Sequence, residues 1–303
     1  MRTLGIAVAL VIALFSTKSA SAQSAEDEDE STRLFESIEW IVGPDVGRLG
    51  DEAEVQIPES CRFTESAGAK AFMLATQNPP SGNERGILLC ENPENAEDHY
   101  FVVFTYDASG YVRDDEGKSL DGAKILATLR RGNEAGNRER RSLGWSELTI
   151  DGWVREPFYD PATNNLTWSL RLSDDTQEST VNHSVRLLGR GGVMHVDLVT
   201  GDEQLAAAVP AFEAMLGGFA YVEGQRYAEW RDGDKMASYG LTALVAGGAG
   251  AAAVKLGLFG KLWKVIAGFF AAAGKFIIVA LVAIGAKLRS VFSRKEPAAA
   301  GSA

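Results

Sequence analysis

Apolar and polar residues alternate strictly over residues 166–172, where three leucines and Trp168 are separated by Thr167, Ser169 and Arg171. A period of two predicts a β-strand that is buried on one face. Short runs rich in apolar, β-branched and aromatic residues predict further strands. These runs are Ala53–Ile57, Cys61–Thr64, Gly86–Cys90, Tyr100–Tyr106 and Phe219–Val222.

Two more apolar runs flank the tetrad Gly189–Gly192, and a single register sorts their residues into two faces. If the tetrad is a hairpin loop, Leu188 lies opposite Val193. The pairs on one face are then His183 with Leu198, Val185 with Val196, and Leu187 with Met194. The pairs on the other face are Arg186 with His195 and Ser184 with Asp197. The tetrad is favoured as a turn, because a phosphate loop needs a helix after it.

Three segments predict helices. They are Ala67–Thr76, a long helix Leu120–Leu143 between a Ser119 cap and Gly144, and a helix after Asp202 with an apolar stripe at Leu205, Val209, Phe212 and Leu216. This order of strands and helices predicts an α+β domain over residues 33–223. We expect an antiparallel sheet with helices on one face, followed by a C-terminal transmembrane helix or helical hairpin.

The start of the chain has the features of a secretory signal peptide over residues 1–22. Arg2 precedes an apolar run, Leu4–Phe15, and small residues end at Ala22. An uncleaved anchor is the alternative, although the run is short for a membrane span. Residues 23–32 include five consecutive acidic residues, which predicts a solvated, disordered leader.

The end of the chain predicts a membrane anchor. Val265–Ala286 is apolar except for Lys275 and would reach about 33 Å as a helix, which matches a hydrocarbon core of about 30 Å. Residues 240–264 form an Ala/Gly-rich apolar segment with a basic loop, and residues 287–303 form a basic tail. Small residues four apart, at Ala243, Gly247 and Ala251, permit close helix packing and a homo-oligomer.

Two membrane topologies remain open, because basic residues flank both apolar segments. Either Val265–Ala286 is the one span and the tail is cytoplasmic, which we favour, or the two segments form a hairpin. The juxtamembrane segment 224–239 carries Tyr227, Trp230 and Tyr239, whose rings suit a membrane interface. Core packing is the alternative for Tyr227.

Charge divides the chain into an acidic domain and a basic tail. Between Gln23 and Tyr239 there are 20 basic and 40 acidic residues, whereas from Gly240 onward there are eight basic residues and one acid. An acidic domain does not bind nucleic acid by neutralising phosphates. The basic tail suits the lipids of an anionic membrane surface.

Cysteines and histidines give few signs of a cofactor or metal site. Cys61 and Cys90 are the two cysteines, and in an exported chain they form either a disulfide or two buried thiols. The three histidines lack zinc-ligand spacing. We therefore expect no metal and no cofactor.

Two groups of residues are candidates for binding, and none is assigned a catalytic role. The first group lies on the predicted hairpin, where Arg186, His195 and Asp197 share a face and could bind an anion or orient a base. The favoured interpretation is a cross-strand charge pair on a solvated face. The second group is Trp153, Glu156, Tyr159 and Asp160, from a stretch dense in aromatic and acidic residues.

The predicted long helix ends in a group of arginines that could contact lipid headgroups or an acidic partner. A solvated helix with a Glu134–Arg138 pair is the favoured alternative. These arginines are Arg130, Arg131, Arg138, Arg140 and Arg141.

Several long runs resemble a bacterial family of predicted membrane-anchored proteins, domain of unknown function 2167. They include GWVREPFYDPATNNLTWSLRL, GNEAGNRERRSLGW, VRLLGRGGVM and VPAFEAMLGGFAYVEGQRYAEWRDGDKMASYGL. Phe158 departs from the family pattern, where a more polar aromatic residue or a histidine is expected. The resemblance implies an inner-membrane protein with its main domain in the periplasm, and it implies no reaction.

The leading hypothesis is an envelope protein whose exported domain binds a protein or lipid partner without catalysis. The first rival is a hydrolase-like envelope enzyme that uses Glu156, Asp160 or His195. The second rival is a structural homo-oligomer assembled through the helix around Gly247.

Overall fold

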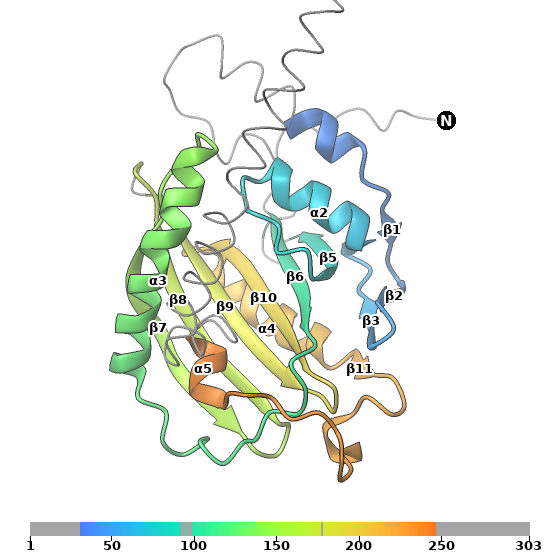
Figure 1. The fold of residues 1–303 in the computed structure, drawn as a ribbon. Coiled ribbons are helices and arrows are strands. Elements are labelled where there is room, and N and C mark those ends of the chain that lie inside the picture. Colours follow the sequence, from blue (N-terminus) through green and yellow to red (C-terminus); the bar gives the residue numbers. More distant parts are fainter. Residues whose placement is uncertain (1–30, 92–94, 96–98, 177, 247–303) are drawn as a thin grey trace, which may run out of the picture. The chain divides into compact units, whose positions relative to one another are not determined.

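The structure is a computed structural model that describes residues 31–91, 95, 99–176 and 178–246 (Figure 1). Eight strands form one antiparallel sheet in the order β1-β4-β5-β6-β10-β9-β8-β7. Their bounds are Ile41–Val42 (β1), Cys61–Glu65 (β4), Glu84–Glu91 (β5), His99–Asp107 (β6), Val193–Gly201 (β10), Ser179–Leu188 (β9), Asn165–Ser173 (β8) and Thr149–Asp160 (β7).

A second, three-stranded sheet has the order β11-β3-β2. Its strands are Phe219–Tyr221 (β11), Ala53–Ile57 (β3) and Asp45–Leu49 (β2). The helices are Ser66–Ala75 (α2), Gly122–Ser142 (α3), Leu205–Leu216 (α4) and the short Leu241–Val245 (α5), with a 3-10 turn at Tyr227–Glu229 (η2). The domain is therefore α+β, with mostly antiparallel pairing.

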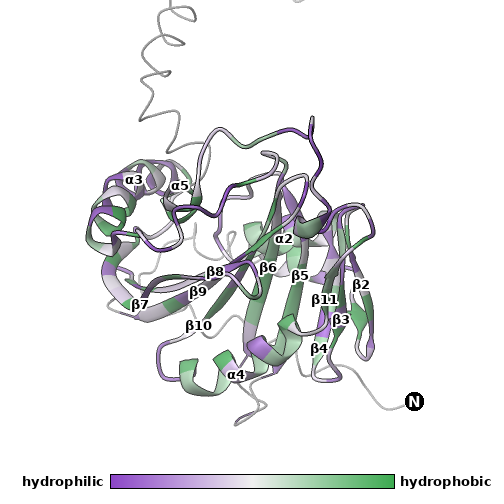
Figure 2. Cartoon of the chain, turned by 90° about the horizontal axis from the view of Figure 1, so that it is seen from below, coloured by the Kyte–Doolittle hydropathy of each residue, from purple (hydrophilic) through white to green (hydrophobic). Residues whose placement is uncertain are grey.

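Helices cover both faces of the large sheet, so the expectation of helices on one face is wrong. Figure 2 shows α2, α3 and α5 on one side of the strands and α4 on the other. We call these sides the α2–α3 face and the α4 face. In β5, Leu88 packs toward α4 whereas Ile87 and Leu89 pack toward α2. Most of β5 is therefore buried on both sides, whereas β10 alternates buried residues with partly exposed ones.

The core on the α4 face is one continuous cluster. It joins the large sheet, the small sheet and α4, whose Phe212 is fully buried. Cys61 and Cys90 lie opposite each other in β4 and β5, and their sulfur atoms are bonded at 2.03 Å. The disulfide therefore joins two strands that are already paired, within this cluster.

The predicted β9–β10 hairpin is confirmed residue by residue. Leu188 pairs with Val193, Arg186 with His195, and Ser184 with Asp197. The tetrad Gly189–Gly192 is the turn between the strands, as expected. A one-residue slip would have moved every apolar side chain to the wrong face, which is why the pattern determines the register.

The predicted helices are present, but two of their caps are wrong. Asp121, rather than Ser119, accepts a hydrogen bond from the Lys124 amide at the start of α3. Asp202 binds the Arg171 side chain instead of capping α4. Gly144 has a φ of 74° just beyond α3, which is the left-handed conformation expected of a residue that follows a helix.

The folded domain continues past residue 223, where the sequence predicted its end. Residues 224–245, which we call the C-terminal strap, run back over the domain. Tyr227 stacks on Tyr111 with ring centroids 4.4 Å apart, and Tyr239 donates a hydrogen bond to Asp107. These two rings therefore pack on the domain, whereas Trp230 stays 39% exposed.

The C-terminal strap ends in α5, whose apolar residues belong to the core. Leu241, Leu244 and Val245 are buried together with Val112 and Ile125. The predicted apolar segment 240–264 therefore begins inside the domain.

Membrane and targeting predictions fall on other parts of the chain. Among the described residues, none of the helices is long and apolar enough to cross a membrane. The signal peptide 1–22, the span 265–286 and the tail 287–303 lie outside the described residues. Residues 31–36 are helical, so the end of the predicted disordered leader 23–32 is ordered.

Candidate polar site on the central strands

Polar residues separate two apolar clusters on the α2–α3 face. One cluster gathers residues of β7, β8, α3 and α5, and the other gathers residues of β5, β6 and α2. Between them, β9 and β10 place Ser184, Arg186, His195 and Asp197 on this face. We call these four residues the polar band. The structure thus confirms that the hairpin brings Arg186, His195 and Asp197 together.

Arg186 is the centre of the polar band. Its Nη1 donates to Asp197 Oδ1 at 2.9 Å and to the Val185 carbonyl at 3.2 Å. Its guanidinium lies 4.6 Å from the ring centroid of Trp168, a cation–π contact. Ser184 Oγ donates to the same Asp197 oxygen at 2.5 Å. One carboxylate oxygen therefore holds two donors from the neighbouring strand.

Burial contradicts the expectation of a solvated charge pair here. Arg186 is 8% exposed, and the Asp197 side chain is 28% exposed. Arg186 lies against Trp168, which belongs to the apolar cluster of β7, β8, α3 and α5, whereas the β10 side of the band is only partly buried. A charge pair in such a place gains from its hydrogen bonds but carries a desolvation cost, unlike a surface pair.

Two buried atoms of the polar band lack a hydrogen-bond partner in the described part of the chain. They are Nε of Arg186 and Nε2 of His195, which lie on directly opposed residues. Burial, and then the charge of Arg186, hold the pKa of His195 well below its usual value, so the imidazole is neutral. Unpartnered buried polar atoms cost stability, and natural domains keep few of them.

The second candidate group is not part of the polar band. It lies on β7, the edge strand of the sheet, and anchors the start of α3. Trp153 Nε1 donates to the Gly122 carbonyl at 3.1 Å, and Tyr159 donates to Asp114 at 2.8 Å. Burial and the Asp114 carboxylate raise the pKa of Tyr159. These two rings therefore act in packing and anchoring.

The two acids of that group have separate environments. Asp160 accepts from the Ala162 amide and the Thr163 hydroxyl, which stabilises the β7–β8 turn. Glu156 is exposed, and its Oε2 lies 3.1 Å from where a Cβ on Gly122 would be. The acid is thus near the start of α3, where a helix dipole favours negative charge.

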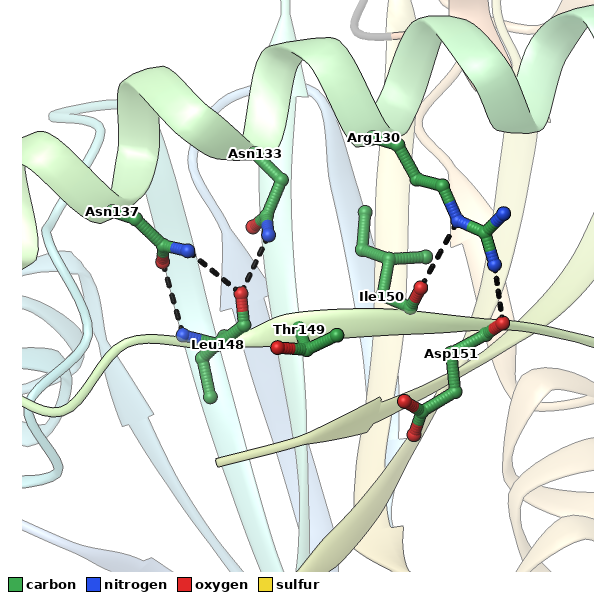
Figure 3. A pocket seen from close by; sticks show the side chains of 7 residues that line it. All are labelled: Arg130, Asn133, Asn137, Leu148, Thr149, Ile150 and Asp151. Atoms are coloured by element: carbon green, nitrogen blue, oxygen red, sulfur yellow. Dashed lines mark hydrogen bonds between the residues drawn. The ribbon is translucent and has the colours of Figure 1, made fainter. Parts of the chain in front are cut away.

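Side chains of α3 bind the backbone that leads into β7, and the sequence-based prediction missed this. Figure 3 shows Asn133 and Asn137 donating to the Leu148 carbonyl, while the Leu148 amide donates back to Asn137. Arg130 Nε donates to the Ile150 carbonyl at 3.1 Å. A shallow cavity of about 440 Å³ lies along this seam. The repeated Gly-Asn pair, four residues apart, was the available signal.

Some arginines of α3 bind the backbone of neighbouring segments and others lie on the surface. The interpretation of a solvated helix therefore holds for only part of the group. Arg130 and Arg140 bind backbone carbonyls, and Arg140 also reaches the Gln77 carbonyl at the end of α2. Arg141 pairs with Glu147 on the surface. Polar contacts therefore add to the apolar packing of Ile125, Leu126 and Leu129 in holding the helix.

The tip of the β9–β10 hairpin is fastened to the C-terminal strap. Arg190 Nε and Nη2 donate to the two oxygens of Asp234 at 2.7 and 2.8 Å. This pair and the Arg231 amide lower the pKa of Asp234 to about 2. Lys235 also donates to the Ala108 carbonyl. A cavity of about 260 Å³ beside this pair is lined by Gly191, Gln225 and neighbours already engaged in these contacts.

The described residues contain no group of three or more His, Cys, Asp or Glu side chains arranged to hold a metal ion.

Comparison with known proteins assigns the family. A family model described as "Protein of unknown function (DUF2167)" matches residues 43–285. The chain belongs to this family. The match spans the whole polar band, the α3 seam and the C-terminal strap, so the DUF2167 region includes every site described above. The comparison with curated proteins found no match.

Several solved structures resemble this DUF2167 chain only distantly. Cyanobacterial PsbP from Synechocystis sp. PCC 6803 is 12% identical, with a TM-score of 0.34, over 60% of this chain and 95% of that one. The Ran-binding protein Mog1p of Saccharomyces cerevisiae is 8% identical, with a TM-score of 0.30, over 63% of this chain and 100% of that one. At these scores the likenesses bear on neither activity nor partner.

Proposed function

We propose that this DUF2167 protein is anchored in the inner membrane of the bacterial envelope and that its periplasmic domain binds a partner through the polar band. The observation that carries the proposal is the pair of unpartnered buried atoms, Arg186 Nε and His195 Nε2. Fold stability alone does not favour such atoms, because apolar residues of similar size would pack there without the cost. A ligand that supplies their hydrogen bonds gives them a function.

The arrangement of the polar band supports binding over hydrolysis. An activated serine nucleophile donates its hydroxyl proton toward a general base, which is most often an imidazole. Here Ser184 donates to Asp197, and that carboxylate is already held by Arg186. The two acids of the rival proposal, Glu156 and Asp160, belong to β7 and not to this group.

The anchoring part of the proposal rests on the sequence. The exported domain is acidic, the tail is basic, and an apolar stretch long enough to span a bilayer, Val265–Ala286, precedes the tail. A partner of the domain would then be met at the membrane surface, as either another envelope protein or a lipid.

Photo-crosslinking in bacterial cells tests the proposal. A photoreactive phenylalanine at Val199 places the probe on β10 two residues beyond Asp197, on the same face of the strand. The matched control replaces Phe158, which is 54% exposed on β7. We expect an adduct from position 199 in the membrane fraction and none from position 158. Absence of an adduct at 199, equal adducts at both positions, or a chain that leaves the membrane fraction would each reject the proposal.

A further inference from the structure

We propose that the polar band takes a singly charged carboxylate, bound side-on to the Nε and Nη2 edge of Arg186. The inference rests on the proposed binding function and names the ligand's chemistry. A guanidinium presents parallel N–H donors along this edge that match the two oxygens of a carboxylate. In Arg186 the Nε donor on that edge has no partner within the described residues.

Other arginines of the same domain use this edge to hold carboxylates. Arg85 donates from Nε and Nη2 to the two oxygens of Glu52 at 3.1 and 3.2 Å. Arg190 does the same with Asp234. Arg171 uses both nitrogens on Asp202. Arg186 is the most buried of these four arginines, yet its own carboxylate, Asp197, is bound through Nη1 instead.

The charges of the polar band favour a monoanion over a dianion as the ligand. Asp197 already compensates the single positive charge of Arg186, and burial keeps His195 neutral. A monoanion adds one negative charge to this half-buried group, whereas a dianionic phosphate adds two beside an existing carboxylate. The neutral His195 imidazole, opposite Arg186 in the register, can donate to a bound oxygen from Nε2 when that nitrogen carries the proton.

Asp197 is the more exposed member of the pair, so we place the approach of the ligand on its side. Since Arg186 Nε is shielded from solvent, binding requires the long arginine side chain to turn toward the incoming acid while it stays over Trp168. The carboxylate could belong to a free small acid or to a peptide C-terminus, which share this chemistry.

Calorimetric titration of the full-length chain tests the inference. Propionate stands for a small acid, N-acetylalanine for a peptide terminus, N-acetylalaninamide for the uncharged counterpart, and inorganic phosphate for a dianion. We expect at least one of the two acids to bind, with the amide and phosphate weaker by about tenfold or more. The stronger of the two acids identifies the source of the carboxylate.

Arg186→Lys keeps the charge but removes the side-on edge, and we expect it to weaken acid binding by about tenfold or more. Arg171→Lys is the matched control, since Arg171 lies on the other face of β8 from Trp168 and also uses its Nε and Nη2. It should leave binding unchanged.

His195→Phe guards against a variant that merely misfolds. It removes an unpartnered buried atom, so it should raise the thermal midpoint of unfolding while it weakens acid binding by several-fold. A merely structural role for His195 would move both quantities in the same direction.

The inference is rejected if neither acid binds, if the amide binds as tightly as the acid, or if Arg186→Lys retains full affinity. A specific crosslink at position 199 together with any of these results would leave the proposed binding function in place and reject the carboxylate alone.

Discussion

The two faces of the large sheet differ in how their apolar residues are arranged. On the α4 face, apolar residues from three layers form one continuous cluster that includes Phe212. On the α2–α3 face, the polar band divides the apolar residues into two clusters. Helices lie on both faces, although the β10 residues of the α2–α3 face, including Asp197, stay partly exposed.

A histidine on each face shows what the difference means. On the α4 face, His183 Nδ1 lies 2.8 Å from Ser169 Oγ, and its ring meets the edge of Phe212 with centroids 5.4 Å apart. On the α2–α3 face, His195 Nε2 has no partner among the described residues. The first histidine is a satisfied core residue, as its sequence pattern indicated. The second carries an energetic cost that a ligand would remove.

The helices that cover the two faces are also attached differently. The buried residues of α4 are apolar, namely Ala208, Phe212 and Met215. In α3, Ile125 is buried in a similar way, but Arg130, Asn133 and Asn137 also bind backbone groups near β7 (Figure 3). Directional polar contacts are individually weaker than a large apolar contact, so loss of one side chain should matter less there.

The largest expected effect is on the α4 face. Phe212→Ala removes a fully buried ring and should lower the free energy of unfolding by about 3–5 kcal/mol, measured by urea denaturation. Phe158→Ala, at a position that is 54% exposed, is the control and should change it by about 0.5 kcal/mol or less. Similar losses from both substitutions would mean that α4 does not cover a tight core.

Lowering the pH should destabilise the fold through His183, the buried histidine of the same face. Burial, with a smaller effect of Arg155, lowers the pKa of His183 from 6.5 to about 4. The unfolded chain therefore takes up this proton first, so stability present above about pH 6.5 is lost progressively down to about pH 4. At about pH 5 the loss from this group is about 2 kcal/mol.

The measurement compares urea unfolding at about pH 7.5 and about pH 5 for the wild type and for His183→Gln, which cannot titrate in this range. The variant should lose about 2 kcal/mol less than the wild type between the two conditions. An equal loss in both proteins would show that other groups govern the acid sensitivity.

An intermediate effect is expected at the α3 seam. Asn137→Ala removes the acceptor of the Leu148 amide and one donor to the Leu148 carbonyl, and should lower the free energy of unfolding by about 1–2 kcal/mol. The Leu148 amide should also exchange with solvent faster. Arg138→Ala, on the exposed side of the same turn, is the control and should have little effect. If the two variants behave alike, the seam does not hold the helix.

The smallest effect has the opposite sign. His195→Phe should raise the free energy of unfolding by about 1 kcal/mol, because the unpartnered Nε2 is lost. His183→Phe should lower it, because Ser169 loses its partner. Thermal or urea unfolding of both variants gives the comparison directly. Destabilisation by both substitutions would remove the distinction between the faces.

Much of the local fold was predictable from the sequence. The hairpin register followed from period-two alternation around a Gly-rich tetrad, which also placed Arg186, His195 and Asp197 on one face. The extents of α2 and α3 followed from their helical pattern and from Gly144. The helix caps were less predictable, because several polar residues near each start compete for the same amide groups.

For the candidate sites, the sequence indicated which residues to consider, but not what each of them contacts. Trp153 and Tyr159 were grouped with Glu156 and Asp160 because they are close in sequence, whereas the structure shows that the two rings anchor α3 and its preceding loop. The pairing of Arg190 with Asp234 joins residues 44 positions apart, and no local pattern announces it. Contacts of this kind depend on how the chain returns to the sheet.

The sequence by itself determined most of the strands and the three longer helices of this protein, the register of its central hairpin and the acidic character of its domain, because these depend on residues close in the chain or on composition; it missed β1, β2 and the place of α5 in the core. Only the tertiary structure decided that helices lie on both faces of the sheet, that the C-terminal strap belongs to the domain, and that Arg186 is buried rather than solvated. The physical reason is that burial is set by neighbours distant in sequence. The same charged residue is a surface ion pair or a binding candidate according to what packs around it.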